Sequence, residues 1–153
     1  MTKERLAYLW EHWHSSVKIE SERGCYDAHH HHGFVPPDVA GQLYLKPDSV
    51  LGLATGSTPL PMYRRLIALH RSLGLDFSEV TTFNLDEYVG MAPENPQSYH
   101  YFMNENFFNK VNIQPDHTYL PDGMAEDLEA EGHRYDALIQ QKGGIDLQVL
   151  GIG

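Results

Sequence analysis

Two short stretches of the sequence carry residue types that could act on a phosphorylated metabolite. The first, residues 55–59, follows an apolar run at 50–54 and places a glycine among hydroxyl side chains, just before a segment with helical periodicity. A glycine lets the backbone turn tightly and approach a ligand, and the amides that begin a helix carry partial positive charge. The stretch matches neither a Walker loop nor a dinucleotide fingerprint, and ordinary helix capping by Ser57 and Thr58 is the alternative. The residues predicted to bind a phosphate are Thr55, Gly56, Ser57 and Thr58.

The second stretch ends in paired carboxylates. Asp86 and Glu87 follow a predicted strand at 80–85, and in open α/β sheets ligands gather beyond the carboxyl ends of the strands. A carboxylate placed there and shielded by Tyr88 can act as a general base with a modestly raised pKa. Because neighbouring residues of an extended segment point to opposite sides, we expect only one acid to face the site. The alternative is a pair of solvated loop acids.

The elements that must position these residues follow a βαβ pattern from Ser49 onward. Short apolar runs alternate there with helix-period segments, which is typical of a parallel sheet. The sequence therefore predicts an α/β fold with a Rossmann-like open, mostly parallel sheet and flanking helices. Strands are predicted at residues 50–54, 80–85, 119–120 and 145–150. Helices are predicted at residues 59–73 with Pro59 at the first helical position, 98–111 with Ser98 as the cap, and 128–141, ended by Gly143 and Gly144.

The chain divides into two parts of different composition, an atypical segment at 1–45 and an α/β domain at 46–153. An amphipathic helix is predicted at residues 3–20. Residues 24–40, which contain four consecutive histidines and Pro36-Pro37, are predicted to form a loop or a disordered segment. Adjacent histidines on such a loop offer a metal no fixed geometry, and no cysteine or carboxylate lies at ligand spacing. We therefore predict no native metal site.

Composition restricts the classes of partner. The 153 residues suffice for one domain. A formal net charge of −10 argues against nucleic acid, whose phosphates require clustered lysine and arginine. A small phosphate ester stays compatible, because backbone amides bind it without net positive charge. No apolar run reaches the roughly 20 residues of a membrane span. Cys25 is the only cysteine, so no intramolecular disulfide is possible, and we predict a cytoplasmic protein.

Three stretches together resemble the N-terminal half of the glucosamine-6-phosphate deaminases, also called isomerase/deaminases. They are VLGLATGSTPLPMYRRL, TTFNLDEYVG and NPQSYHYFMNENFFNKVNI, and the resemblance runs from about Lys46 to Gly153. The related 6-phosphogluconolactonases share the fold and a similar Gly-Ser-Thr-Pro turn. They usually carry Asp-Glu-Arg, however, where this chain has Asp86-Glu87-Tyr88. Tyr88 and the stretch at 95–113 therefore favour the deaminases.

The resemblance implies a reaction of amino sugar catabolism, in which glucosamine 6-phosphate and water give fructose 6-phosphate and ammonia. It implies that residues 55–58 hold the sugar phosphate or nearby hydroxyls. Asp86 matches the family's catalytic base, which takes the C2 proton of the ring-opened sugar and returns it at C1. A carboxylate with two oxygens suits a base that must reach both carbons. No cofactor is implied, and a homo-oligomer is expected for the full-length protein.

The family's pattern continues after Gly153 with a second Asp, a ring-opening His, its Glu partner and a later phosphate-binding Lys. We therefore expect this chain to be a fragment, truncated at its C-terminus and not fully active alone. Three alternatives stay open: a non-catalytic remnant that at most binds sugar phosphate, a 6-phosphogluconolactonase-type hydrolase, and a phosphate-binding regulator. The sequence shows no partner domain or DNA-reading helix for the regulator.

Overall fold

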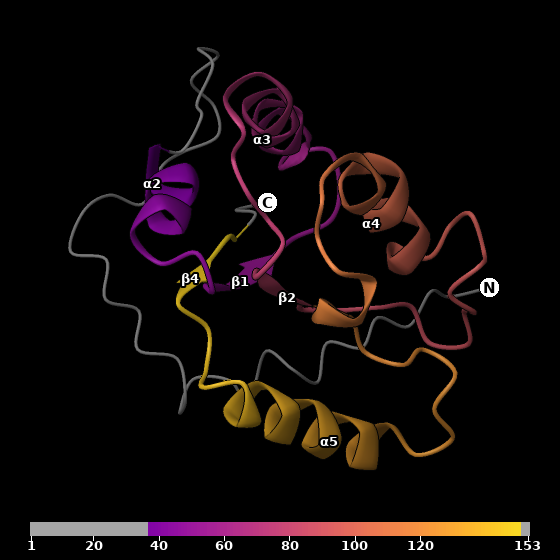
Figure 1. Ribbon diagram of the computed structural model, residues 1–153. Helices are drawn as coiled ribbons and strands as arrows, with labels where there is room; N and C mark the ends of the chain where they lie inside the picture. The colour runs from indigo at the N-terminus through magenta and orange to yellow at the C-terminus, as the bar shows by residue number, and fades with distance from the viewer. Residues whose placement is uncertain (1–36, 151–153) are drawn as a thin grey trace.

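A four-stranded parallel sheet forms the centre of the molecule (Figure 1). The computed structural model describes residues 37–150, so the predicted helix at 3–20 and the histidine run lie outside the described residues. The sheet has the order β3-β2-β1-β4, and every neighbouring pair is parallel. Its strands are β1 (Val50–Leu53), β2 (Thr81–Asn84), β3 (Thr118–Tyr119) and β4 (Leu147–Gln148). The predicted open α/β sheet is confirmed.

Each strand overlaps the range that the sequence predicts for it, and β4 is much shorter than predicted. β4 covers two of the six residues predicted at 145–150, because only Leu147 and Gln148 pair with β1. β3 lies at the opposite edge and pairs with β2 through Thr118 and Tyr119. The central pair is longer, with four residues of β1 in register with four of β2. The carboxyl ends of this pair lead directly into residues 55–58 and 86–87.

Helices cover both faces of the sheet. In Figure 1, α2, α3 and α4 lie on one side of the strands and α5 lies on the other. Short 3-10 turns follow α4 and precede β3, at Phe108–Lys110 and Pro115–His117. The helices are α2 (Pro37–Leu45), α3 (Leu60–Leu73), α4 (Tyr99–Asn106) and α5 (Leu128–Gln141). Among residues 37–150, no helix is both long and apolar enough to cross a membrane.

The first described helix corrects the sequence analysis. A loop was predicted up to residue 40, but α2 begins at Pro37. Proline is tolerated in the first turn of a helix, because the amide that it lacks has no partner in the helix there. Val39, Ala40 and Leu43 are buried in the main core. Their burial against the sheet stabilises a helix that the Pro-Pro pair does not suggest.

Most helix ends agree with their predicted caps. The Ser98 hydroxyl accepts a hydrogen bond from the Tyr101 amide at 3.0 Å, so the predicted cap of α4 is confirmed. Gly143 and Gly144, with φ of 90° and 85°, end α5 as predicted. The predicted helix at 98–111 is too long, however. Phe107 leaves the helical conformation at φ −145° and ψ −63°, and both Phe107 and Phe108 are buried in the core.

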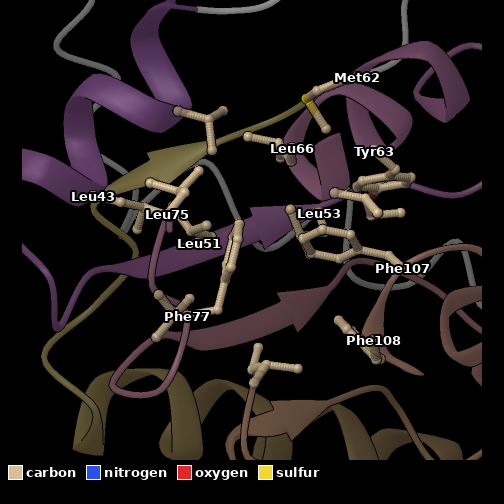
Figure 2. Close-up of a cluster of buried hydrophobic side chains, with 14 of the residues drawn as sticks. Leu43, Leu51, Leu53, Met62, Tyr63, Leu66, Leu75, Phe77, Phe107 and Phe108 are labelled. Atoms are coloured by element: carbon tan, nitrogen blue, oxygen red, sulfur yellow. The ribbon is translucent and has the colours of Figure 1, made fainter. Parts of the chain in front are cut away.

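Side chains from both faces of β1 are buried, which explains its uninterrupted apolar sequence. Leu51 and Leu53 belong to the larger core cluster, which lies between the sheet and α2, α3 and α4 (Figure 2). Val50 belongs to a smaller cluster that includes Tyr135 of α5 on the opposite face. With apolar packing on both sides, the central strands form a rigid base for the loops that follow them.

Candidate active site

The two predicted site segments leave the sheet at the same edge. Leu53 and Asn84 are partners in the register of β1 with β2, and each is the last residue of its strand. Thr55 and Asp86 each lie two residues further along the chain. The parallel register therefore brings the hydroxyl-rich turn and the paired carboxylates to adjacent strand ends. This is the sheet edge at which α/β proteins bind ligands.

The turn at residues 55–58 presents uncommitted hydrogen-bonding groups to solvent. Gly56, Ser57 and Thr58 are exposed, and Gly56 has a φ of 96°, which a residue with a side chain rarely adopts. Within residues 37–150, their three amides donate no hydrogen bond, and the hydroxyls of Ser57 and Thr58 make none. The N-cap of α3 is Pro59, without a side-chain cap bond. The alternative of ordinary helix capping by these hydroxyls is therefore not supported.

The start of α3 offers fewer free amides for anion binding than the sequence predicts. The helix begins at Leu60, so Pro59 is its N-cap rather than its first residue. Neither Pro59 nor Pro61 has an amide hydrogen. The Leu60 amide donates to the Ser57 carbonyl at 3.3 Å. Any anion bound here would therefore depend mainly on the amides and hydroxyls of the turn itself.

Asp86 lies just beyond β2 and is half-buried. It is within electrostatic reach of the Tyr135 hydroxyl on the α5 side of the sheet. Burial raises the pKa of Tyr135 well above its usual value, and the negative charge of Asp86 adds a smaller increase. A carboxylate in this position is partly shielded from water while it stays at the ligand-binding edge.

Glu87 has a different environment, with none of its surface exposed. Its Oε1 accepts hydrogen bonds from the amides of Tyr88 at 2.8 Å and Tyr99 at 2.9 Å. Its Oε2 accepts one from the His100 amide at 3.0 Å and lies 2.8 Å from His100 Nδ1. Burial alone would raise the pKa of Glu87, but these hydrogen bonds outweigh it and lower the pKa. The alternative of two solvated loop acids is thus wrong for Glu87.

The two adjacent acids are therefore separated by their surroundings. Glu87 is bound to the first amides of α4, whereas Asp86 is half-buried just beyond the end of β2. The expectation that only one of the two acids faces the site stays a prediction. The role of Glu87 was missed, because its amide partners lie 12 and 13 residues further along the chain. A carboxylate that binds the first amides of a distant helix leaves no local pattern in the sequence.

Two buried tyrosines hold the strand ends from opposite faces of the sheet. Tyr63 of α3 donates its hydroxyl hydrogen to the carbonyl of Ala54, just after β1. Tyr135 of α5 donates to the carbonyl of Asn84 at 2.7 Å, and the Tyr119 carbonyl lies 3.1 Å from the same hydroxyl. Sequence analysis missed both, because the acceptors are backbone atoms and carry no residue-type signal. The main chain that leads into each loop is thus anchored to a helix.

Asn84 completes the contacts between the two strand ends. Its side chain is fully buried, and Nδ2 donates to the Leu53 carbonyl at 3.3 Å. Its Oδ1 has no hydrogen-bond partner among the described residues. Among those residues, no group of three or more His, Cys, Asp or Glu side chains is arranged to hold a metal ion.

Comparison with known proteins identifies the family. The family model of the glucosamine-6-phosphate isomerases/6-phosphogluconolactonase matches residues 43–153. The chain belongs to this family. Over 115 residues it is 64% identical to a glucosamine-6-phosphate deaminase from Halothermothrix orenii, which covers 75% of this chain and 48% of the relative. It is 57% identical to a glucosamine-6-phosphate deaminase from Thermoanaerobacter pseudethanolicus, over 75% of this chain and 46% of the relative.

Solved structures of family members have the same architecture. A monomeric glucosamine-6-phosphate deaminase is similar at a TM-score of 0.73 and 49% identity, over 75% of this chain and 48% of that one. A 6-phosphogluconolactonase from Thermotoga maritima is similar at a TM-score of 0.60 and 25% identity, over 74% of this chain and 50% of that one. The chain spans about half the length of the curated relatives that it matches.

Proposed function

We propose that the protein is a glucosamine-6-phosphate deaminase, which converts glucosamine 6-phosphate and water to fructose 6-phosphate and ammonia. The observation that carries the proposal is the register of Leu53 with Asn84, because it brings a turn with free amides to the same edge as Asp86. The relatives at 57–64% identity, whose names state this activity, support it. They also favour it over the lactonase activity within the same family.

Each segment has a defined role in this proposal. The amides and hydroxyls of residues 55–58 bind the phosphate. Asp86 removes the proton from C2 of the ring-opened sugar and delivers it to C1, which leaves an imine at C2. Water then adds to C2 and ammonia departs, so the products are the ketose phosphate and ammonia. One carboxylate serves both carbons, because its two oxygens can reach adjacent positions.

Asp86→Asn tests the catalytic role. In the protein expressed from its complete gene, the variant should lose turnover by roughly 10²–10⁴-fold, the range that general base catalysis contributes. Binding of glucosamine 6-phosphate should change little, because Asn keeps the size of the side chain. Release of ammonia measures turnover, and calorimetry measures binding. Turnover above a few per cent of the wild-type rate would remove Asp86 as the base.

A double substitution of Ser57 and Thr58 by valine tests the phosphate site. It removes two exposed hydroxyls and keeps the backbone turn. Binding of glucosamine 6-phosphate should weaken by roughly 100-fold or more, because hydrogen bonds to a charged group contribute about 1.5–3 kcal/mol each and two are removed. Binding of unphosphorylated glucosamine should change far less. Equal losses for the two sugars would refute the phosphate assignment.

The other expectations remain proposals of the same kind. We propose cytoplasmic amino sugar catabolism and a homo-oligomer for the full-length protein, although one structural relative is described as monomeric. We also propose that the α/β domain, predicted to begin near residue 46, includes α2, because Val39, Ala40 and Leu43 belong to its main core. Turnover of a 6-phosphogluconolactone without turnover of the amino sugar would favour the lactonase alternative. Binding of sugar phosphate without either reaction would favour the non-catalytic one.

A further inference from the structure

The loop that follows Asp86 is bound at its first turn to the start of α4. The Glu87 carboxylate joins them, because it accepts hydrogen bonds from the Tyr88 amide on the loop and from the Tyr99 and His100 amides on the helix. A carboxylate at a helix N-terminus is also favoured by the helix dipole. Further along the same helix, Met103 is fully buried in the main core. The peptide that follows Asp86 is therefore fixed to the core of the domain.

The main chain near Gly123 also packs against this loop. The Gly90 amide donates to the Gly123 carbonyl at 2.7 Å. A Cβ atom at residue 123 would lie 2.3 Å from the Tyr88 carbonyl oxygen and 3.1 Å from Glu87 Cγ. The main chain at Gly123 thus packs directly against the loop. With α4 on one side and this segment on the other, the backbone from Glu87 to Gly90 has little freedom to move.

His100 is the one side-chain partner of Glu87 among the described residues, since its other hydrogen bonds come from backbone amides. The contact of Nδ1 with Oε2 at 2.8 Å is a hydrogen bond when Nδ1 carries the proton. The His100 side chain is 26% exposed, whereas Glu87 is fully buried. A substitution at His100 can therefore weaken the anchor without creating a cavity in the core.

We propose that Glu87 and His100 are positioning residues for the reaction, and that together they hold the Asp86 carboxylate at the distance and angle needed to reach C1 and C2. The inference rests on the proposed function, in which Asp86 is the base. Asp86 directly precedes Glu87, so any rotation of the Glu87 backbone changes the direction of the Asp86 side chain. Proton transfer between adjacent carbons is sensitive to such a change, because a displacement of about 1 Å can lower a rate roughly 10²-fold.

Four variants of the protein expressed from its complete gene test the proposal. Glu87→Gln keeps the shape of the side chain but replaces one acceptor oxygen by a donor nitrogen. His100→Gln removes the Nδ1 donor, whereas His100→Asn places an amide donor near the position of Nδ1. Ser98→Ala is the matched control, because the Ser98 hydroxyl caps the same helix through the Tyr101 amide, donates to the Pro93 carbonyl at 2.9 Å and makes no hydrogen bond to Glu87.

We expect kcat for glucosamine 6-phosphate to fall about tenfold or more in Glu87→Gln and several-fold in His100→Gln, with KM within about threefold of wild type. His100→Asn should restore most of the rate that His100→Gln loses. Ser98→Ala should lower the melting temperature and leave kcat close to wild type. Equal losses of kcat in Ser98→Ala and His100→Gln would overturn the proposal, because helix destabilisation alone would then explain them.

Amide hydrogen exchange of residues 86–90 separates this inference from the proposed function, because it needs no turnover. Exchange should be faster in Glu87→Gln and His100→Gln than in wild type, and it should be near wild type in Ser98→Ala and His100→Asn. Faster exchange together with full turnover in Asp86→Asn would refute the catalytic assignment and leave the anchor standing. Unchanged exchange and unchanged kcat in both Glu87→Gln and His100→Gln would overturn the anchor. If Glu87→Gln does not fold, the two His100 variants decide the question.

Discussion

Tyr135→Phe tests how firmly α5 holds the end of β2, at the edge of the sheet where we propose that the substrate binds. The Tyr135 side chain is 1% exposed, and its hydroxyl donates to the Asn84 carbonyl at 2.7 Å, at the end of β2. Phenylalanine keeps the ring and its edge-on contact with Phe83, whose centroid lies 5.6 Å away. The substitution therefore removes one hydrogen-bond donor and leaves the apolar packing in place.

The expected loss of stability follows from the Asn84 carbonyl, which is left without its hydrogen-bond donor. A buried carbonyl that loses its hydrogen-bond partner destabilises a protein by about 1–3 kcal/mol. Loss of a single oxygen atom leaves little empty space, so the cavity contribution is only a few tenths of a kcal/mol. We therefore expect the free energy of unfolding to fall by about 1–3 kcal/mol. With a urea m-value of roughly 2 kcal/mol/M, the midpoint should fall by about 0.5–1.5 M.

Urea unfolding of wild type, Tyr135→Phe and Tyr44→Phe measures this change. Tyr44 is the matched control, because its side chain is 64% exposed and the same atom is removed into solvent. Its free energy of unfolding should stay within roughly 0.5 kcal/mol of wild type, as is typical of surface substitutions. If Tyr135→Phe unfolds at the same urea concentration as Tyr44→Phe with an unchanged m-value, the Asn84 carbonyl does not depend on this hydroxyl. The anchoring of β2 by α5 would then be refuted.

Two further substitutions test contacts around the same edge. Gly123→Ala should destabilise the protein by about 1–3 kcal/mol, because its Cβ would lie 2.3 Å from the Tyr88 carbonyl oxygen; a wild-type urea midpoint would contradict this. Glu131 has a lowered pKa, since hydrogen bonds from Arg134 and the Asp122 amide outweigh the effect of burial, which alone would raise it. The stability that this shift contributes is present above the ordinary carboxyl pKa and is lost as pH falls through the lowered value. The free energies of unfolding of wild type and Glu131→Gln should therefore differ at mildly acidic pH and converge in strong acid. A difference that stays constant with pH would contradict this role of Glu131.

Local patterns in the sequence predict much of the fold. The apolar run at 50–54 and the Ser98 cap both depend on near neighbours in the chain, and both are found where they were predicted. The turn at 55–58 and the acids at 86–87 were likewise predicted from residues close to them in the chain. Their meeting at one edge requires only that β1 and β2 be parallel neighbours, which the βαβ pattern predicts.

The elements that the sequence does not predict depend on distant partners. α2 is stabilised by burial of Val39, Ala40 and Leu43 against the core, and the prolines that precede them suggest a loop. In the sequence Glu87 resembles an exposed loop acid. In the structure it accepts hydrogen bonds from two amides of α4, which lie 12 and 13 residues further along the chain. A pattern of residue types cannot show which backbone atoms a side chain will meet after folding.

The proposed site separates groups that hold the backbone from exposed groups that we propose bind the substrate. Tyr63 and Tyr135 bind the carbonyls of Ala54 and Asn84 at the ends of β1 and β2. Glu87 binds the amides of Tyr88 after β2 and of Tyr99 in α4, and all three anchoring side chains are buried. The hydroxyls of Ser57 and Thr58, in contrast, are exposed and make no hydrogen bond within the described residues. A functional side chain on a flexible loop would lose orientation each time the loop moved, whereas one on an anchored loop keeps it. For this reason, substitutions of the buried anchors should change the rate of catalysis more than the affinity, and substitutions of the exposed hydroxyls should change the affinity more than the rate.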